Sequence, residues 1–164
     1  MKNKTILYLS KEIDSAALKG AATRDYFGDC LLGRLESGKP IIINPQGYFI
    51  SVSHSGGVTA VVISDTPVGL DIEEIREIDF EKIKKGFFSE EDAEKITDLN
   101  SFFEFWVKKE AESKVSGEGI FKSRKKDISM IFTSLSREIS TFAEKSFSGT
   151  LAADKTLSFT IRKM

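Results

Sequence analysis

The sequence has few of the residues that build disulfide frameworks or transition-metal sites. Its single cysteine, Cys30, excludes an internal disulfide and a zinc site made of several cysteines. Its single histidine, His54, excludes a histidine-rich metal centre. At 164 residues the chain is long enough to fold around an apolar core without cross-links.

An excess of charge of one sign is also missing. Lys and Arg total 24, and Asp and Glu total 25, which gives a net charge of −1. That balance excludes wholesale attraction to nucleic acid or to an anionic membrane, so a charged partner must be met by a local patch. No apolar run approaches the roughly 18 residues of a membrane span, and the N-terminal apolar stretch is too short for a signal peptide. We therefore expect a cytoplasmic protein without nucleic-acid or membrane partners.

The first part of the chain predicts short strands around one helix. Residues Thr5 to Leu9 and Val58 to Ile63 are apolar, β-rich runs that predict buried strands. Phe27, Leu31 and Leu35 recur at helical spacing within Asp25 to Glu36, which predicts a helix there. Ile41 to Ile43 and Tyr48 to Val52 flank a Pro- and Gly-containing turn and predict a hairpin.

The second part predicts helices followed by strands. A strand begins at Val68, a short helix covers Phe80 to Phe87, and Ser89 caps a second short helix. Ser101 to Ser116 is the clearest helix, and the tail from Ile128 favours strands. This order predicts an α+β fold with mainly antiparallel pairing.

Two motifs carry acidic residues in positions that suit catalysis or metal binding. In the strand that begins at Val68, Asp71 and Glu73 lie on one face, about 6–7 Å apart. Two such carboxylates repel, and a hard ion such as Mg²⁺ would relieve the repulsion. In the long helix, Glu110 and Lys114 are four residues apart and share a face. Each pattern also fits the alternative of an ordinary solvated strand or salt bridge.

Three further segments are rich in hydrogen-bond donors. Residues 51–57, Ser-Val-Ser-His-Ser-Gly-Gly, end a strand and could contact phosphate or hold a structural histidine. Lys39 lies in a turn before a strand. The cluster Lys122, Arg124, Lys125 and Lys126 is either a solvated loop or a docking site for an acidic partner.

Together and in this order, the motifs resemble those of the 4′-phosphopantetheinyl transferase superfamily. The matching segments are Gly38-Lys39-Pro40, Ser53-His54-Ser55, Gly69-Leu70-Asp71-Ile72-Glu73, Phe87-Phe88-Ser89 and Trp106-x-x-Lys109-Glu110-Ala111-x-x-Lys114. The Ser-His-Ser segment is similar to that of the two-half members, which activate peptide and polyketide synthetases and acyl carrier proteins. The resemblance implies a pseudo-twofold monomer of two sheet-plus-helix halves, residues 1–65 and 66–164.

The resemblance also implies an activity. The family transfers the 4′-phosphopantetheine arm of coenzyme A to a serine of an apo carrier protein and releases 3′,5′-ADP. By the resemblance, Asp71, Glu73 and Glu110 hold Mg²⁺, and Glu110 accepts the serine proton, directly or through a water molecule. Lys114 stabilises or protonates the leaving phosphate. Trp106 and Ala111 are expected to be packing residues that hold the helix in place.

The resemblance assigns the coenzyme A contacts as well. They fall to Lys39, Ser53, His54, Lys109 and Lys114, and the basic cluster is expected to dock the carrier protein.

Other functions remain open at this point. A non-catalytic relative that binds carrier proteins would lack the transfer activity. An Mg²⁺-dependent phosphohydrolase would use the same carboxylates without a protein acceptor. Nucleic-acid binding would rest only on the basic cluster, which has no interleaved aromatic residues.

Overall fold

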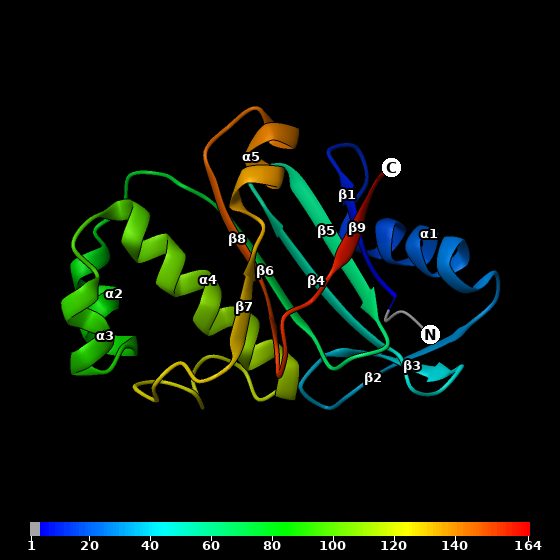
Figure 1. The fold of residues 1–164 in the computed structure, drawn as a ribbon, viewed down its shortest axis with the longest axis horizontal. Coiled ribbons are helices and arrows are strands. Elements are labelled where there is room, and N and C mark those ends of the chain that lie inside the picture. Colours follow the sequence, from blue (N-terminus) through cyan, green and yellow to red (C-terminus); the bar gives the residue numbers. More distant parts are fainter. Residues whose placement is uncertain (1–3) are drawn as a thin grey trace.

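The computed structural model describes residues 4–164, which form a mixed α+β fold with several sheets (Figure 1). The elements of the first part are β1 (Thr5–Ser10), α1 (Ser15–Phe27), β2 (Leu31–Arg34), β3 (Pro40–Asn44), β4 (Phe49–Ser55) and β5 (Val58–Ser64). Those of the second part are β6 (Gly69–Glu74), α2 (Phe80–Phe87), α3 (Glu90–Lys95), α4 (Leu99–Ser116), β7 (Ile131–Ser134), α5 (Ser136–Ala143), β8 (Phe147–Ala153) and β9 (Phe159–Lys163).

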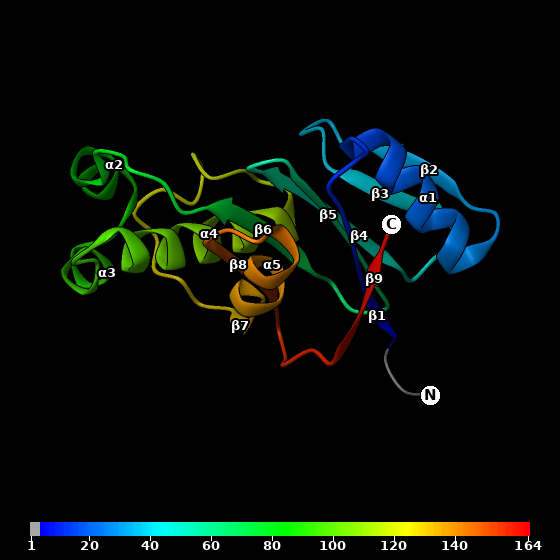
Figure 2. The ribbon, with the colours of Figure 1, turned by 90° about the horizontal axis from the view of Figure 1, so that it is seen from above.

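Two sheets form the centre of the molecule. One has the strand order β4-β5-β1-β9, and the other has the order β6-β8-β7. Their apolar side chains meet in a shared core that includes Leu7, Val62, Leu70 and Leu151. Helix α1 packs on β5 of the first sheet, and α4 packs on β6 and β8 of the second (Figure 2). A separate core joins α2 and α4 through aromatic rings, and Ala93 of α3 packs against it.

Most of the strand and helix predictions are confirmed. Strands β1, β5 and β6 lie where the apolar runs place them, and all seven residues of β5 are buried. The Ser89 hydroxyl accepts a hydrogen bond from the Asp92 amide and caps α3, which ends at Lys95. Helix α4 begins after a capping box formed by Asp98 and Ser101. Within residues 4–164, no helix is both long and apolar enough to cross a membrane.

The helix predicted over Asp25 to Glu36 is wrong. Helix α1 ends at Phe27, and Gly28 leaves the helix at a φ of 80° with its amide still bonded to the Arg24 carbonyl. Beyond it the chain forms strand β2 instead. Leu31 and Leu35 are 56% and 43% exposed, so the apolar spacing does not mark a buried helix face.

Two more predictions of local structure are wrong. Strand β3 pairs with β2, and β4 pairs with β5, so the segments around Pro45 do not form the predicted hairpin. Helix α5 lies within the tail that the sequence assigned to strands, and its Ile139 is fully buried against the core. The division at residue 65 stays a prediction. Strand β9, from the second part, pairs with β1 in parallel.

Helix α4 lies unusually close to β6 because one residue of the strand has no side chain. A Cβ on Gly69 would lie 1.8 Å from the Ala111 carbonyl oxygen and 3.0 Å from a Val115 methyl group. Ala111 is fully buried, so its backbone has no room to withdraw. The glycine therefore determines how closely the acidic strand and the acidic helix approach.

We predict that Gly69→Ala lowers the free energy of unfolding by about 1–3 kcal/mol or more, because the added methyl group overpacks this contact. Gly86→Ala in α2 is the control, since a Cβ there would meet no atom within 4 Å. That substitution should instead stabilise the helix by up to about 1 kcal/mol. Urea unfolding of both variants measures the difference, and equal effects would contradict the close approach.

Candidate active site

The centre of the site is Asp71, which is 4% exposed. Its Oδ1 atom accepts hydrogen bonds from Lys114 Nζ at 2.7 Å and from Ser53 Oγ at 2.9 Å. Its Oδ2 atom is buried and has no hydrogen-bond partner among the described residues. Burial raises the pKa of Asp71, although Lys114 and Ser53 oppose the rise. A buried carboxylate with one oxygen unpaired is a group that a cation would stabilise.

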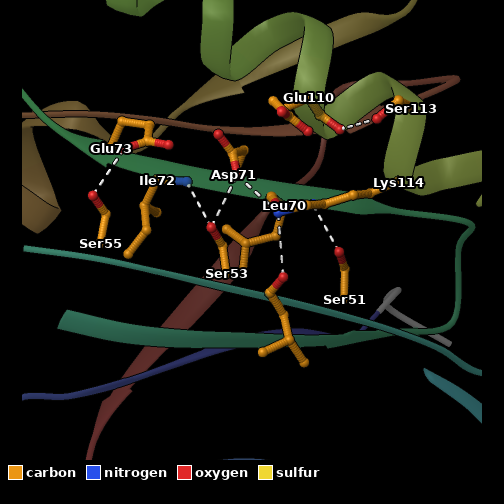
Figure 3. A network of polar contacts seen from close by, with 11 residues as sticks. Ser51, Ser53, Ser55, Leu70, Asp71, Ile72, Glu73, Glu110, Ser113 and Lys114 are labelled. Carbon is orange, nitrogen blue, oxygen red and sulfur yellow. Dashed lines mark hydrogen bonds and ion pairs between the residues drawn. The ribbon is translucent and has the colours of Figure 1, made fainter. Parts of the chain in front are cut away.

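Glu110 approaches Asp71 from helix α4. Figure 3 shows its side chain pointing from the helix toward Asp71. Burial raises the pKa of Glu110 to about 7, and the negative charges of Asp71 and Glu73 add to the rise. The three carboxylates therefore lie close enough for their charges to repel, with Lys114 opposing the repulsion.

Glu73 lies on the same face of β6 as Asp71, as strand alternation predicts (Figure 3). Its Oε2 atom accepts hydrogen bonds from Ser55 Oγ at 2.9 Å and from Arg76 at 3.3 Å. Neither Ser55 nor Arg76 was singled out from the sequence as a partner of an acidic residue. The alternation of serines at positions 51, 53 and 55 is the signal that could have indicated the Ser55 contact.

Lys114 binds both sheets as well as Asp71. Its Nζ atom donates to the carbonyl of Val52 in β4 at 3.3 Å and to the carbonyl of Leu70 in β6 at 3.1 Å. The prediction that Glu110 and Lys114 share a face of α4 is confirmed: Lys114 forms an ion pair with Asp71, and Glu110 lies near enough for the Asp71 charge to raise its pKa.

The donor set has the chemistry of a site for a hard divalent ion. Three carboxylates supply oxygen ligands of the kind that Mg²⁺ prefers, and Asp71 Oδ2 is an oxygen with no protein partner. Within residues 4–164, however, no three Asp, Glu, His or Cys side chains are grouped closely enough to hold an ion. Ligation by all three carboxylates would therefore require side-chain rearrangement. The residues fit the ion in the chemistry of their donor oxygens.

Lys39 lies beside this group rather than within it. It lines a pocket of about 250 Å³ together with Glu110, Lys114 and Gly117. Its ammonium group donates a hydrogen bond to the carbonyl of Val115, near the end of α4, and burial lowers the pKa of Lys39. The sequence prediction that Lys39 and the α4 residues serve one site is consistent with this shared pocket.

The structure separates His54 from the carboxylates. His54 is exposed and lines a hollow of about 260 Å³ beside Asp14 and Ser15, at the start of α1. Its neighbours Ser53 and Ser55 point instead toward β6. Ser53 is 6% exposed, and its hydroxyl group is bonded to protein atoms on both sides.

Lys109 also points away from the carboxylates. It is 2% exposed, its Nζ atom donates to the carbonyl of Lys126 at 2.8 Å, and it lies over the ring of Phe88. Burial lowers the pKa of Lys109, and the acidic residues that oppose the shift include Asp92 rather than Asp71.

The expectation that Trp106 and Ala111 are packing residues is confirmed. The Trp106 ring stacks on Phe102 at a centroid distance of 5.8 Å and meets Phe87 edge-on. Ala111 is fully buried. These contacts hold α4 in place, and with it Glu110 and Lys114.

Comparison with known proteins identifies a family and several relatives of this chain. The sequence profile of the 4′-phosphopantetheinyl transferase superfamily matches residues 67–158, more than half of the chain. The 4′-phosphopantetheinyl transferase psf-1 of Bacillus pumilus is 39% identical over 93 residues, which are 51% of this chain and 38% of that protein. The transferase gsp of Aneurinibacillus migulanus is 36% identical over 97 residues, 56% of this chain and 40% of that protein. The match thus spans about two-fifths of the length of these relatives.

We predict that Lys114→Met lowers the free energy of unfolding by about 3 kcal/mol, because it leaves the Asp71 charge buried without its ion pair. Lys108→Met is the control on the same helix. Its ion pair with Glu104 is more exposed, so the loss should stay within about 1 kcal/mol. Urea denaturation measures both variants. Equal decreases in the free energy of unfolding would show that the Lys114–Asp71 pair stabilises the fold no more than the exposed Lys108–Glu104 pair does.

Proposed function

Because the chain belongs to the 4′-phosphopantetheinyl transferase superfamily, we propose that it transfers the 4′-phosphopantetheine arm of coenzyme A to a serine of an apo carrier protein. The serine oxygen forms a bond to the β-phosphorus of coenzyme A, and the bond to the departing 3′,5′-ADP breaks. The observation that supports this reaction best is the group formed by Asp71, Glu110 and Lys114, with Glu73 beside it on β6.

The proposal gives each side chain of this group a task. Asp71, Glu73 and Glu110 would hold Mg²⁺, which supplies positive charge to the diphosphate when it is bound. Glu110 accepts the proton of the serine hydroxyl, directly or through a water molecule. Burial raises the pKa of Glu110 to about 7 when no ion is bound. A carboxylate bound to Mg²⁺ is a weaker base, so the route through a water molecule is the easier one. Lys114 stabilises the negative charge on the leaving phosphate.

Coenzyme A contacts are proposed for the two more accessible basic residues. Lys39 lies in the pocket with Glu110 and Lys114, and His54 is exposed beside the Gly56–Gly57 turn. Contact of Ser53 or Lys109 with coenzyme A stays a prediction, since both side chains are buried and bonded to protein atoms.

The pseudo-twofold arrangement is part of the proposal, and the strand topology supports it. In the first part, β1 and α1 are followed by β4 and β5, in the order β4-β5-β1. In the second part, β6 and α4 are followed by β7 and β8, in the order β7-β8-β6. All four pairings in these two units are antiparallel. Monomeric state and cytoplasmic location, also part of the proposal, rest on the sequence alone.

The direct test mixes the protein with coenzyme A, Mg²⁺ and several apo carrier proteins. We expect a phosphopantetheine adduct in the intact mass of a carrier protein. Glu110→Gln should abolish the adduct, because the base and one metal ligand are lost, while Glu104→Gln on the exposed face of α4 should keep it.

Other outcomes identify the other functions. Full activity of Glu110→Gln would refute the site. Carrier binding without an adduct would indicate a non-catalytic relative. Phosphate release without a protein acceptor would indicate a phosphohydrolase.

The carrier-docking surface is proposed at the basic loop after α4. Lys122, Arg124, Lys125 and Lys126 are exposed, and Phe121 beside them is 77% exposed. A positive patch around an exposed aromatic side chain suits an acidic protein partner.

We predict that Lys122→Glu and Lys125→Glu each raise the KM for the carrier protein on the order of 3- to 10-fold, because attraction becomes repulsion. The KM for coenzyme A should not change. Lys155→Glu, on the exposed loop between β8 and β9, is the control. Steady-state kinetics with each substrate varied tests the assignment, and an unchanged carrier KM would refute it.

A further inference from the structure

Three serines on one face of β4 form hydrogen bonds with the edge of β6. The hydroxyl oxygens of Ser51, Ser53 and Ser55 accept hydrogen bonds from the amides of Leu70, Ile72 and Glu74, at 3.0, 3.2 and 3.1 Å. The other edge of β6 pairs with β8, and β4 belongs to a different sheet. The serine side chains therefore satisfy amides that would otherwise lack partners at a sheet edge.

Two of these three serines make a second bond, and both of these bonds go to acidic residues. Ser53 donates its hydroxyl proton to Asp71 Oδ1, and Ser55 donates its proton to Glu73 Oε2, each at 2.9 Å (Figure 3). The two carboxylates are then held in the same manner. One oxygen is bonded to the serine and to a basic residue, Lys114 for Asp71 and Arg76 for Glu73.

The remaining oxygens differ from these bonded ones. Asp71 Oδ2 is buried and has no hydrogen-bond partner among the described residues. Every hydrogen bond that the Glu73 carboxylate accepts within residues 4–164 goes to Oε2, which leaves Oε1 without a bond. Fixing one oxygen of a carboxylate determines where the other oxygen points.

We propose that Ser53 and Ser55 are positioning residues that orient Asp71 and Glu73 toward a divalent cation. The proposal rests on the metal site of the proposed function. It assigns the Ser-His-Ser segment two separate tasks: the serines orient acidic side chains on β6, and His54 faces the opposite side of β4. Hydrogen bonds to metal-ligating carboxylates commonly affect metal affinity by 10- to 100-fold.

Ser51 provides a matched control within the same strand. Its hydroxyl bonds the Leu70 amide in the same way, and it has no bond to a carboxylate. Loss of the Ser51 hydroxyl therefore removes one interstrand hydrogen bond only. Loss of the Ser53 or Ser55 hydroxyl removes the same kind of bond together with the orientation of an acidic side chain.

The experiment compares Ser51→Ala, Ser53→Ala and Ser55→Ala by two measurements. Urea unfolding should show that all three variants still fold, with the smallest decrease in the midpoint for Ser51→Ala, which loses a single hydrogen bond. Titration with Mn²⁺ alone, followed by the electron paramagnetic resonance signal of the free ion, should show about 10-fold or greater weakening for Ser53→Ala and Ser55→Ala. Ser51→Ala should bind Mn²⁺ as the wild type does, and Ser55→Thr, which keeps the hydroxyl, should restore the affinity.

The outcomes separate this proposal from the proposed function. Equal Mn²⁺ affinities in all three alanine variants, with a wild type that binds Mn²⁺ and modifies a carrier protein, would overturn the positioning role alone. Equal weakening in Ser51→Ala would overturn it too, since the effect would be structural. A wild type that neither binds Mn²⁺ nor modifies a carrier protein would overturn both proposals. Should Ser53→Ala fail to fold, the half-buried Ser55 still decides the result through its alanine and threonine variants.

Discussion

The site depends on the way in which the edge strands β4 and β6 meet. They belong to different sheets, and side chains join them: three serine hydroxyls bind β6 amides, and Lys114 binds a carbonyl of each strand. The serines recur every second residue along β4, and so do the amides that they bond along β6. This match fixes the register of β4 against β6. Asp71 and Glu73, both on β6, then have a defined position relative to the first sheet.

Helix α4 completes the site from the opposite direction. Gly69 allows the Ala111 backbone to lie against β6, and the aromatic core around Trp106 holds the helix in that position. Lys114 consequently forms an ion pair with Asp71, and Glu110 points to the same side of the helix. A larger residue at position 69 would separate the strand from the helix and would divide the group of charges.

The balance of charge in this group explains what it can bind. Asp71, Glu73 and Glu110 repel one another, and Lys114 is the basic residue that opposes the repulsion at Glu110. A divalent cation would stabilise the carboxylates, and its remaining charge would attract a diphosphate. Lys39 lines a pocket together with Glu110 and Lys114 and adds a basic residue beside this group.

Patterns along the sequence predict which residues share a face of one strand or one helix. Strand alternation placed Asp71 and Glu73 on one face, and helical spacing placed Glu110 with Lys114. Pairing between distant strands is not a local property, so the sequence does not show that β3 pairs with β2 instead of β4. The spacing of Phe27, Leu31 and Leu35 also fitted a helix, but Gly28 ends α1 and leaves two of these side chains exposed.

The direction of Lys109 was not predicted for a related reason. Neighbouring residues on a helix do not share a face, so Lys109 enters the aromatic core while Glu110 faces Asp71. The motif shows that both residues are present, but it does not show which side of α4 meets β6. That choice depends on Gly69 and on the apolar residues of the helix.

The central claim is that Asp71, Glu73 and Glu110 share one cation with the diphosphate of coenzyme A. Anomalous diffraction from crystals grown with Mn²⁺ and coenzyme A tests it most directly. The account predicts one strong peak about 2.0–2.2 Å from an oxygen of each carboxylate and from a diphosphate oxygen. A bound coenzyme A whose diphosphate lies away from Asp71, or a Mn²⁺ ion without Glu110 among its ligands, would contradict it.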